Sequence, residues 1–410
     1  MNNSWTTLAD AGPALYRPGL FGFREWLFGQ WFGGIRRGQL TVVFPSGTQR
    51  TFAGSEPGPH AMLEIYDMRL VSRMLRGGDL GFAESYMAGE WDTPDLALLL
   101  RLGCLNVDAL SGALSRSWMA NLLGRIRHAR RANTRRGSRR NIAAHYDLGN
   151  DFYRLWLDET MTYSSALFAD MKEPMVPAQR RKYRRLAEKL DLRPGDRVLE
   201  IGCGWGGFAE IAAAEFGCRV VGLTLSSEQA AHARARMARK GLADAVDIRL
   251  QDYRDVSGQF DKIVSIEMFE AVGERHWPTF FKVLDDRLVP GGRAALQIIT
   301  IDETKFAGYR RHPDFIQRYI FPGGMLPSPE AFHASAKRGG FQVSDAFFFG
   351  ASYAESLRRW DQAFRDNWPE IAKLGFDERF RRMWHYYLRY CETGFDQGTI
   401  DVGQFVLERS

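Results

Sequence analysis

The sequence predicts an α/β fold with a mostly parallel sheet, preceded by a smaller N-terminal α+β domain. Apolar runs typical of buried strands alternate with helical stretches between about residues 195 and 300. Such alternation is typical of a parallel sheet with helices on both faces. One of these runs leads directly into a glycine-rich turn. The chain of 410 residues is long enough for two domains, and an arginine-rich segment divides it.

Residues 1–124 form the predicted N-terminal domain. Its first apolar stretch, residues 20–37, is rich in aromatic side chains spaced three to four residues apart and ends in two arginines. Such a stretch fits either a helix packed into its own domain or a helix lying at a membrane surface. The other elements expected here are a β-hairpin of residues 40–44 and 49–52, a helix of residues 61–75, and a second helix of residues 81–92 that Gly89 ends.

The basic charge of the chain is concentrated in residues 125–140, which we expect to be a linker. This segment contains eight arginines and no acid, and without it the net charge would be −2 instead of +6. Basic runs attract phosphate groups, either of nucleic acid or of anionic lipid. A solvated linker without a partner explains the same composition, so the segment alone does not decide between these interpretations.

The composition limits the classes of protein to consider. A hydrophobic content of 45% and a charged content of 25% are those of a soluble globular protein. No apolar run approaches the ~20 residues that cross a bilayer, and the N-terminus lacks the pattern of a signal peptide. The four cysteines are scattered without metal-ligand spacing. We therefore predict no metal site and expect a reducing, cytoplasmic location.

The glycine-rich turn predicts a site for a nucleotide-like ligand. A predicted strand of residues 197–201 carries Glu200 near its end, and Gly202, Gly204 and Gly207 match the pattern of dinucleotide-binding enzymes. Those enzymes need an acid about 20 residues further on, at the end of the second strand, to hold the ribose. Here the second strand ends in Thr224, Leu225 and Ser226. An acid placed before the first glycine suits S-adenosylmethionine instead, because a carboxylate can hold its ammonium group.

The ends of the following predicted strands carry further polar side chains. Residues 224–229, 252–253 and 267–270 each follow an apolar run, and another strand is expected at residues 288–299. Ligands in parallel sheets bind beyond the carboxyl ends of the strands. We therefore expect these segments and the glycine-rich turn to lie around one site.

Motifs along most of the chain resemble those of the cyclopropane-fatty-acyl-phospholipid synthases. The matching segments are residues 81–92, 145–152, 161–164, 200–207, 222–229, 251–255, 268–273 and 319–323. The resemblance implies a Rossmann-like class I methyltransferase domain over residues 141–410, with a helical insertion that covers the acyl site. It implies that residues 1–124 associate with lipid and take part in dimerisation.

The resemblance implies S-adenosylmethionine as the cofactor and assigns its contacts. Gln229 is placed near the ribose, and Asp252 and Tyr253 are placed near the adenine. The full set of implied cofactor contacts is Tyr163, Ser164, Glu200, Gly202, Gly204, Trp205, Gly206, Thr224, Leu225, Gln229, Asp252 and Tyr253.

The catalytic residues implied by the resemblance include two departures from the family pattern. The family holds a bicarbonate ion that takes a proton from the substrate, and Glu270, the backbone of Ile299 and Tyr353 match three of its holders. A cysteine of the family is replaced by Ser165, and a histidine is replaced by Gln297. Both can still donate hydrogen bonds, so a bicarbonate could still bind. Glutamine cannot carry a charge or shuttle a proton as histidine does, so we expect the proton-removal step to have changed.

Two neighbouring positions complete this comparison. The histidine that usually follows the catalytic glutamate is Ala271 here. The resemblance also places His145 near the site and among the catalytic residues, although a lone histidine beside Tyr146 and Asp147 is more often structural.

We therefore predict an enzyme that transfers a one-carbon unit from S-adenosylmethionine to the double bond of an unsaturated fatty acyl chain in membrane phospholipid. The expected product is a methyl-branched or methylated unsaturated chain, with cyclopropane formation as the alternative. The expected partners are unsaturated phospholipid chains and the anionic inner face of the membrane, with a homodimer also expected. We expect no nucleic-acid partner, because the sequence contains neither an Asn-Pro-Pro-Tyr nor a Pro-Cys methyltransferase signature. The cofactor turn disfavours a non-catalytic lipid-binding protein.

Overall fold

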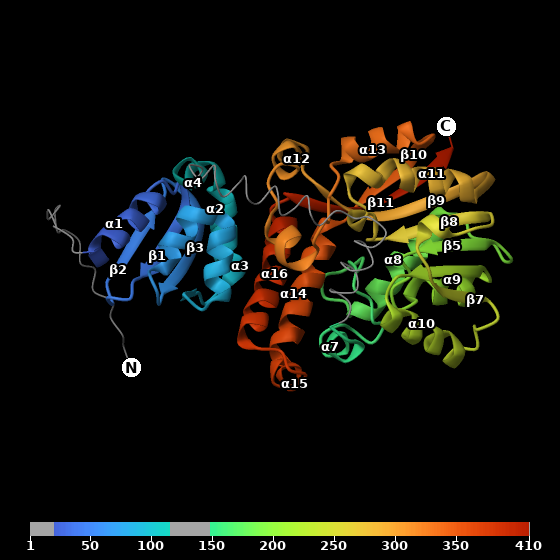
Figure 1. The fold of residues 1–410 in the computed structure, drawn as a ribbon, viewed down its shortest axis with the longest axis horizontal. Helices are drawn as coiled ribbons and strands as arrows, with labels where there is room; N and C mark the ends of the chain where they lie inside the picture. Colours follow the sequence, from blue (N-terminus) through green and yellow to red (C-terminus); the bar gives the residue numbers. More distant parts are fainter. Residues whose placement is uncertain (1–19, 115–147, 410) are drawn as a thin grey trace.

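The computed structural model describes residues 20–114 and 148–409. It contains a small N-terminal sheet domain and a larger α/β domain, and the helices α14 (Gly350–Asp366) and α16 (Glu378–Asp396) lie between them (Figure 1). The predicted basic linker and His145 lie outside the described residues.

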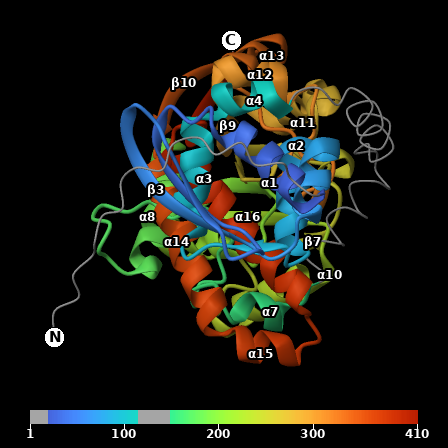
Figure 2. The same cartoon turned by 90° about the vertical axis from the view of Figure 1, so that its left-hand side faces the viewer.

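The N-terminal domain is built on a four-stranded sheet with the order β2-β1-β3-β4. The predicted hairpin is confirmed, because β1 and β2 pair antiparallel. Figure 2 shows this sheet facing the viewer with its helices around it. The elements of the domain are α1 (Leu20–Phe32), β1 (Arg37–Val43), β2 (Gln49–Ala53), β3 (Glu56–Ile65), α2 (Arg69–Met87), β4 (Trp91–Asp92), α3 (Leu96–Leu105) and α4 (Val107–Leu114).

The prediction of a helix over residues 61–75 is wrong in its first part. Residues 61–65 belong to β3, in which Ala61, Leu63 and Ile65 are buried while Met62 is exposed. This alternation has the period of a strand, and β3 pairs parallel with β1. The helix α2 begins only at Arg69 and runs through a kink at Gly78 into the second predicted helix. It ends at Met87, two residues before Gly89, whose positive φ of 71° stops it.

The aromatic stretch of α1 packs into the core of its own domain. Phe28, Trp31 and Phe32 are buried, and Ile35 just beyond the helix is buried with them. Trp26 is 49% exposed. For these buried side chains the structure therefore favours the core interpretation over membrane contact.

The large domain contains a seven-stranded sheet with the order β10-β11-β9-β8-β5-β6-β7. The strands from β7 to β9 are parallel, and β11 is antiparallel to both of its neighbours. The strands are β5 (Arg197–Ile201), β6 (Arg219–Thr224), β7 (Val246–Leu250), β8 (Phe260–Ile266), β9 (Leu288–Ile301), β10 (Phe341–Phe348) and β11 (Ile400–Arg409). The prediction of a mostly parallel sheet is confirmed, although β10 and β11 were not predicted.

Helices cover both faces of this sheet, as predicted (Figure 1). One apolar core joins the sheet to α8, α9 and α10 through side chains such as Leu186, Ala209 and Met237. A second core joins it to α11 and α13 through Phe281, Leu284 and Phe332. The helices are α7 (Asn150–Arg154), α8 (Met175–Lys189), α9 (Gly207–Phe216), α10 (Ser227–Arg239), α11 (Trp277–Arg287), α12 (Glu303–Tyr309), α13 (Pro329–Arg338) and α15 (Trp368–Lys373), with α14 and α16 as above.

The predicted helical insertion is formed by α14, α15 and α16, which lie in the chain between β10 and β11. The N-terminal domain docks onto α16 through the buried Arg382. Its guanidinium donates to the backbone oxygens of Tyr86 and Trp91 at 2.5 and 2.6 Å and to Asp92 at 3.0 Å. Among the described residues, none of the helices has the length and apolar character to span a bilayer.

Candidate functional site

A cavity of about 1230 Å³ runs from the carboxyl ends of the central strands to the N-terminal domain. Its walls include the glycine-rich turn, the segment that follows β8, the helix α16, and apolar side chains of α2, α3 and α4. The predicted residues that line it are Tyr163, Ser164, Glu200, Gly202, Gly204, Trp205, Thr224, Leu225, Gln229, Asp252, Tyr253, Glu270 and Tyr353. Ser165 and Gln297 lie directly behind this wall, hydrogen-bonded to a residue that lines it.

The glycine-rich turn brings the backbone close to this cavity. Gly202, Gly204 and Gly206 all have positive φ values, of 86°, 51° and 85°. A Cβ on Gly202 would lie 2.9 Å from Cγ of Met268. The turn therefore needs glycine both for its backbone conformation and for its close packing. Gly206 caps the N-terminus of α9, whose free N–H groups favour a polar ligand.

Glu200, near the end of β5, is a buried carboxyl group at the edge of the cavity. Its side chain is 2% exposed, and its Oε2 atom has no hydrogen-bond partner among the described residues. Burial raises the pKa of Glu200 well above its usual range, although Arg236 and a backbone hydrogen bond from Ala209 act in the opposite direction. A buried acid with one unpartnered oxygen is suited to an ammonium group, which would supply the missing donor and the compensating charge.

The remaining predicted cofactor residues are held by local hydrogen bonds. The Thr224 hydroxyl donates to Oε1 of Gln229 at 2.7 Å and so orients its amide. The Trp205 indole donates to Oδ1 of Asn150, at the start of α7, at 2.7 Å. Asp252 forms an ion pair with Arg254 at 2.6 Å. These contacts arrange the side chains around the end of the cavity nearest the glycine-rich turn.

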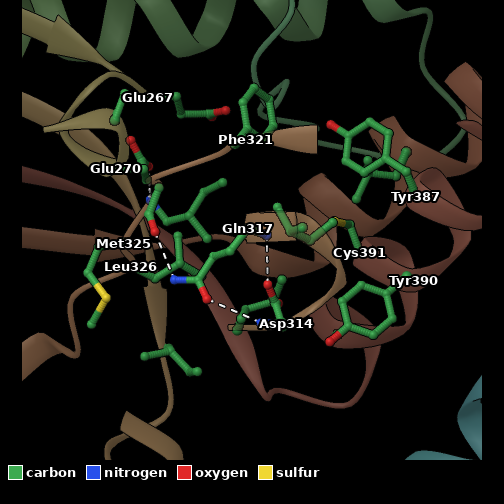
Figure 3. Close-up of a pocket in the computed structure, with 18 of the residues that line it drawn as sticks. Glu267, Glu270, Asp314, Gln317, Phe321, Met325, Leu326, Tyr387, Tyr390 and Cys391 are labelled. Carbon is green, nitrogen blue, oxygen red and sulfur yellow. Dashed lines mark hydrogen bonds between the residues drawn. The ribbon is translucent and has the colours of Figure 1, made fainter. Parts of the chain in front are cut away.

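Two carboxyl groups, Glu267 and Glu270, face the middle of the cavity (Figure 3). Oε1 of Glu267 accepts hydrogen bonds from the backbone N–H of Ser165 at 2.9 Å and from Nε2 of Gln297 at 2.7 Å, and Oε2 accepts from the Tyr353 hydroxyl at 2.7 Å. Residues 267–270 were expected at this strand end, but no role was predicted for Glu267. The available signal was its position directly after β8.

Glu270 has a different environment from Glu267. Its Oε1 accepts a hydrogen bond of 2.5 Å from the backbone N–H of Ile299, and its buried Oε2 has no partner among the described residues. Burial, together with the charge of Glu267, raises the pKa of Glu270 to about 8. Burial also raises the pKa of Glu267, but Lys182 and the three donated hydrogen bonds oppose this shift. Since more donors favour the ionised form, the negative charge of the pair resides mainly on Glu267.

Lys182 of α8 is a buried cation near this pair that was not predicted from the sequence. Its ammonium donates to the Ser164 hydroxyl at 2.6 Å and lies 4.5 Å from the centroid of the Tyr183 ring. Burial lowers the pKa of Lys182 to about 7, against the opposing effects of Glu267 and Asp158. No local sequence signal distinguishes Lys182 from its basic neighbours, because four arginines, all half-buried, stand within three residues of it in α8.

The rest of the cavity is mainly apolar and aromatic, with Asp314 and Gln317 among its polar side chains (Figure 3). Tyr309 and Phe321 line it, whereas Phe269, Phe280 and Phe281 are fully buried in the core beside the sheet. The opposite wall comes from α16, with Tyr387, Tyr390 and Cys391, and Tyr387 lies beside Phe321 (Figure 3). The sequence did not predict this contribution of α16.

We expect Glu270→Gln to change how stability depends on pH. A carboxyl group whose pKa is about 8 in the folded protein and near 4.5 when unfolded stabilises the fold fully below about pH 4.5. That contribution is lost as the pH rises to about 8. Urea unfolding at pH 5, 6.5 and 8 should therefore show the variant gaining stability relative to the unmodified protein as the pH increases. A difference that is the same at all three pH values would contradict the buried, neutral state of Glu270.

The sequence matches a family model described as mycolic acid cyclopropane synthetase over residues 133–405. It is 42% identical over 378 residues to the tuberculostearic acid methyltransferase of Mycobacterium tuberculosis, covering 90% of this chain and 88% of that protein. It is 38% identical over 365 residues to the cyclopropane-fatty-acyl-phospholipid synthase of Escherichia coli, covering 87% and 89% of the two chains.

Solved structures agree with this assignment. The mycolic acid cyclopropane synthase CmaA1, crystallised with SAH and CTAB, aligns with a TM-score of 0.62 at 34% identity, over 66% of this chain and 98% of that chain. The predicted Rossmann-like methyltransferase fold is thereby confirmed. The chain belongs to the mycolic acid cyclopropane synthetase family of S-adenosylmethionine-dependent fatty-acyl methyltransferases, as its motifs predicted.

Proposed function

We propose that the protein transfers a one-carbon unit from S-adenosylmethionine to the double bond of an unsaturated fatty acyl chain in a membrane phospholipid. The product is a methyl-branched or methylated unsaturated chain. Closure of a cyclopropane ring across a cis double bond is the alternative outcome at the same site.

The observation that carries this proposal is the single cavity that joins a polar end to an apolar one. Its volume of about 1230 Å³ exceeds the ~300–1,000 Å³ of ordinary small-molecule sites. The polar end lies at Glu200 and the glycine-rich turn, and the apolar end reaches Leu99 and Leu102 in the N-terminal domain. Such a cavity has room for a nucleoside cofactor and for a long hydrocarbon chain directed towards it.

The residues at the polar end fit S-adenosylmethionine. The unpartnered Oε2 of Glu200 would accept from its ammonium group, and Gln229, oriented by Thr224, would contact the ribose. Asp252 and Tyr253 would lie near the adenine. The bound cofactor supplies an electrophilic methyl group, because its sulfonium carries a positive charge. The other proposed contacts are Tyr163, Ser164, Gly202, Gly204, Trp205, Gly206 and Leu225.

The residues at the middle of the cavity would determine the product. Attack by the alkene on the methyl group leaves a carbocation on the acyl chain, which must be kept from water and must lose a proton. Loss of a proton from the new methyl group closes a ring, and loss from a neighbouring carbon gives a methylated alkene. Glu270, Tyr353, Ser165 and Gln297 are the proposed catalytic group of this region, with His145 added by the family resemblance.

The lipid substrate requires contact with a membrane surface. The arginine-rich residues 125–140 would bind anionic headgroups at the inner face of the cytoplasmic membrane. The match to a phospholipid synthase of Escherichia coli over most of the chain supports the same substrate class. We propose a homodimer as the working form and no nucleic-acid partner.

Incubation with labelled S-adenosylmethionine and anionic vesicles carrying unsaturated chains tests this function. Mass spectrometry of the acyl methyl esters should show a gain of one CH₂. Mild hydrogenation should then add H₂ to that product, because a methylated alkene retains its double bond. A product that resists hydrogenation would establish the cyclopropane alternative. The absence of label from mono-ene and diene lipids alike would refute acyl-chain methylation.

A further inference from the structure

We infer that Glu267 is the proton acceptor of this enzyme, and that its carboxylate takes the place of a bound bicarbonate ion. This inference rests on the proposed function and names the group that completes its second step. Its basis is the position in the chain of the three groups that donate hydrogen bonds to Glu267.

The donors to Glu267 are three of the positions at which the family holds its bicarbonate. The backbone of Ser165, the amide of Gln297 and the hydroxyl of Tyr353 all donate to its two oxygens, at 2.9, 2.7 and 2.7 Å. A bicarbonate and a glutamate carboxylate present the same pair of acceptor oxygens to such donors. The side chain of Glu267 therefore fills the anion site from within the protein.

The replacement of histidine by Gln297 is explained by the same arrangement. Arg185 can only donate, and it donates to Oε1 of Gln404 at 2.8 Å. Nε2 of Gln404 must then face Oε1 of Gln297, to which it donates at 3.0 Å. This leaves Nε2 of Gln297 directed at Glu267 as a fixed donor. A donor fixed in this way serves an ionised carboxylate and needs no proton-shuttling capacity of its own.

The backbone of Glu267 is held in a conformation that suggests functional selection. Its φ is 51°, in the left-handed region that residues other than glycine and asparagine rarely adopt. Such strain persists where the surrounding structure enforces it, and it is common at active sites. It directs the carboxylate from the end of β8 into the cavity, beside Glu270.

The chemical step balances without any further reactant. The alkene electron pair forms a bond to the methyl carbon while the bond between sulfur and methyl breaks, which leaves S-adenosylhomocysteine and a carbocation. The pair of a C–H bond next to the cation then becomes the new double bond, and the proton passes to a Glu267 oxygen. Each oxygen of a carboxylate can accept about two hydrogen bonds, so Oε2, which accepts one from Tyr353, retains the capacity to receive it.

The test compares the unmodified enzyme with Glu267→Gly in buffer freed of bicarbonate. Glycine accepts the positive φ, so this variant should fold while opening an anion-sized space between the three donors. We expect the unmodified enzyme to keep its rate without bicarbonate. The variant should lose on the order of 100-fold or more, as for other general bases, and regain at least about tenfold when bicarbonate or formate is added. Glu267→Gln, which fills the space without a charge, should be inactive and should not be rescued.

Control measurements separate this inference from the proposed function. Glu274→Gln is the control variant, because it removes the same charge at a partly exposed residue that pairs with Arg310. We expect its activity to be unchanged. S-adenosylhomocysteine affinity should be the same in all variants. NMR with ¹³C-bicarbonate should show saturable binding to Glu267→Gly and none to the unmodified protein, whether or not a lipid product forms.

Two results would overturn the role of Glu267 while leaving methyl transfer intact. One is an unmodified enzyme that stops when bicarbonate is removed and recovers when it is restored. The other is a Glu267→Gly variant with undiminished activity in bicarbonate-free buffer. Bicarbonate bound to the unmodified protein at the site would likewise refute the occupancy argument.

Discussion

Replacement of Arg382 by methionine should release the N-terminal domain from the methyltransferase domain. The variant keeps an apolar side chain of similar length but removes the donors to the backbone oxygens of Tyr86 and Trp91 and the charge that pairs with Asp92. It also removes a guanidinium that stacks 4.0 Å from the centroid of the Tyr86 ring. Removing the donor of a buried hydrogen bond costs about 1–3 kcal/mol, and two such bonds are lost here, whereas the pair with the partly exposed Asp92 adds little. We expect the sum of these losses at the domain interface.

The loss of Arg382 should affect the acyl substrate and the cofactor product differently. The cavity crosses the interface that Arg382 holds, so methylation of long acyl chains should fall strongly. The affinity for S-adenosylhomocysteine, measured by calorimetry, should be retained because the glycine-rich turn lies in the other domain. Limited proteolysis should detect the separated domains. Arg381→Met is the matched control, because its ion pair with Glu378 is largely exposed and such pairs are worth only about 0–1 kcal/mol. Equal behaviour of the two variants would contradict the role of Arg382.

Replacement of Glu200 by glutamine should weaken cofactor binding and stabilise the ligand-free protein. An ammonium group bound at Glu200 would lose its ion pair in a buried site, and a loss of about 3 kcal/mol corresponds to about a 100-fold weaker affinity. The free protein, by contrast, no longer buries an acid with an unpartnered oxygen. The two effects have opposite signs, which a merely structural role of Glu200 would not produce.

The stabilisation by Glu200→Gln should depend on pH. The raised pKa means that Glu200 supports the fold fully below the unfolded pKa and loses this contribution as the pH rises through the folded pKa. The advantage of glutamine should therefore grow with pH in urea unfolding experiments. Glu215→Gln on α9, where the acid forms a surface pair with Arg184, is the control and should leave cofactor affinity unchanged. An unaltered affinity in Glu200→Gln would exclude Glu200 as the ammonium ligand.

The sequence was sufficient for the parallel core of the large domain because its signals are local. A strand, a glycine turn and a helix follow one another within residues 197–216, and each depends on neighbours in the chain. The cofactor segments could also be placed together, because the carboxyl ends of parallel strands meet at one edge. Local signals were weaker at β3, where an alternating apolar pattern of five residues was mistaken for the start of a helix.

The strands β10 and β11 and the contribution of α16 to the cavity depended on tertiary contacts. β11 lies between β9 and β10 although it is the last element of the chain, and no spacing in the sequence encodes that pairing. Likewise, Tyr387 of α16 and Phe321 meet across the cavity only because the insertion folds back onto the sheet.

By itself, the sequence determined the family, the succession of parallel strands and helices along the chain, and the candidates Glu270, Tyr353, Ser165 and Gln297. Only the tertiary structure decided which acceptor the donors Ser165, Gln297 and Tyr353 face. Glu267 stands three residues from Glu270 and 86 from Tyr353, and its hydrogen bonds reach across 102 residues to Ser165. The partner of a buried donor is set by the packing of distant segments, so the position of the carboxylate became visible only when β8, β9 and α14 were brought together.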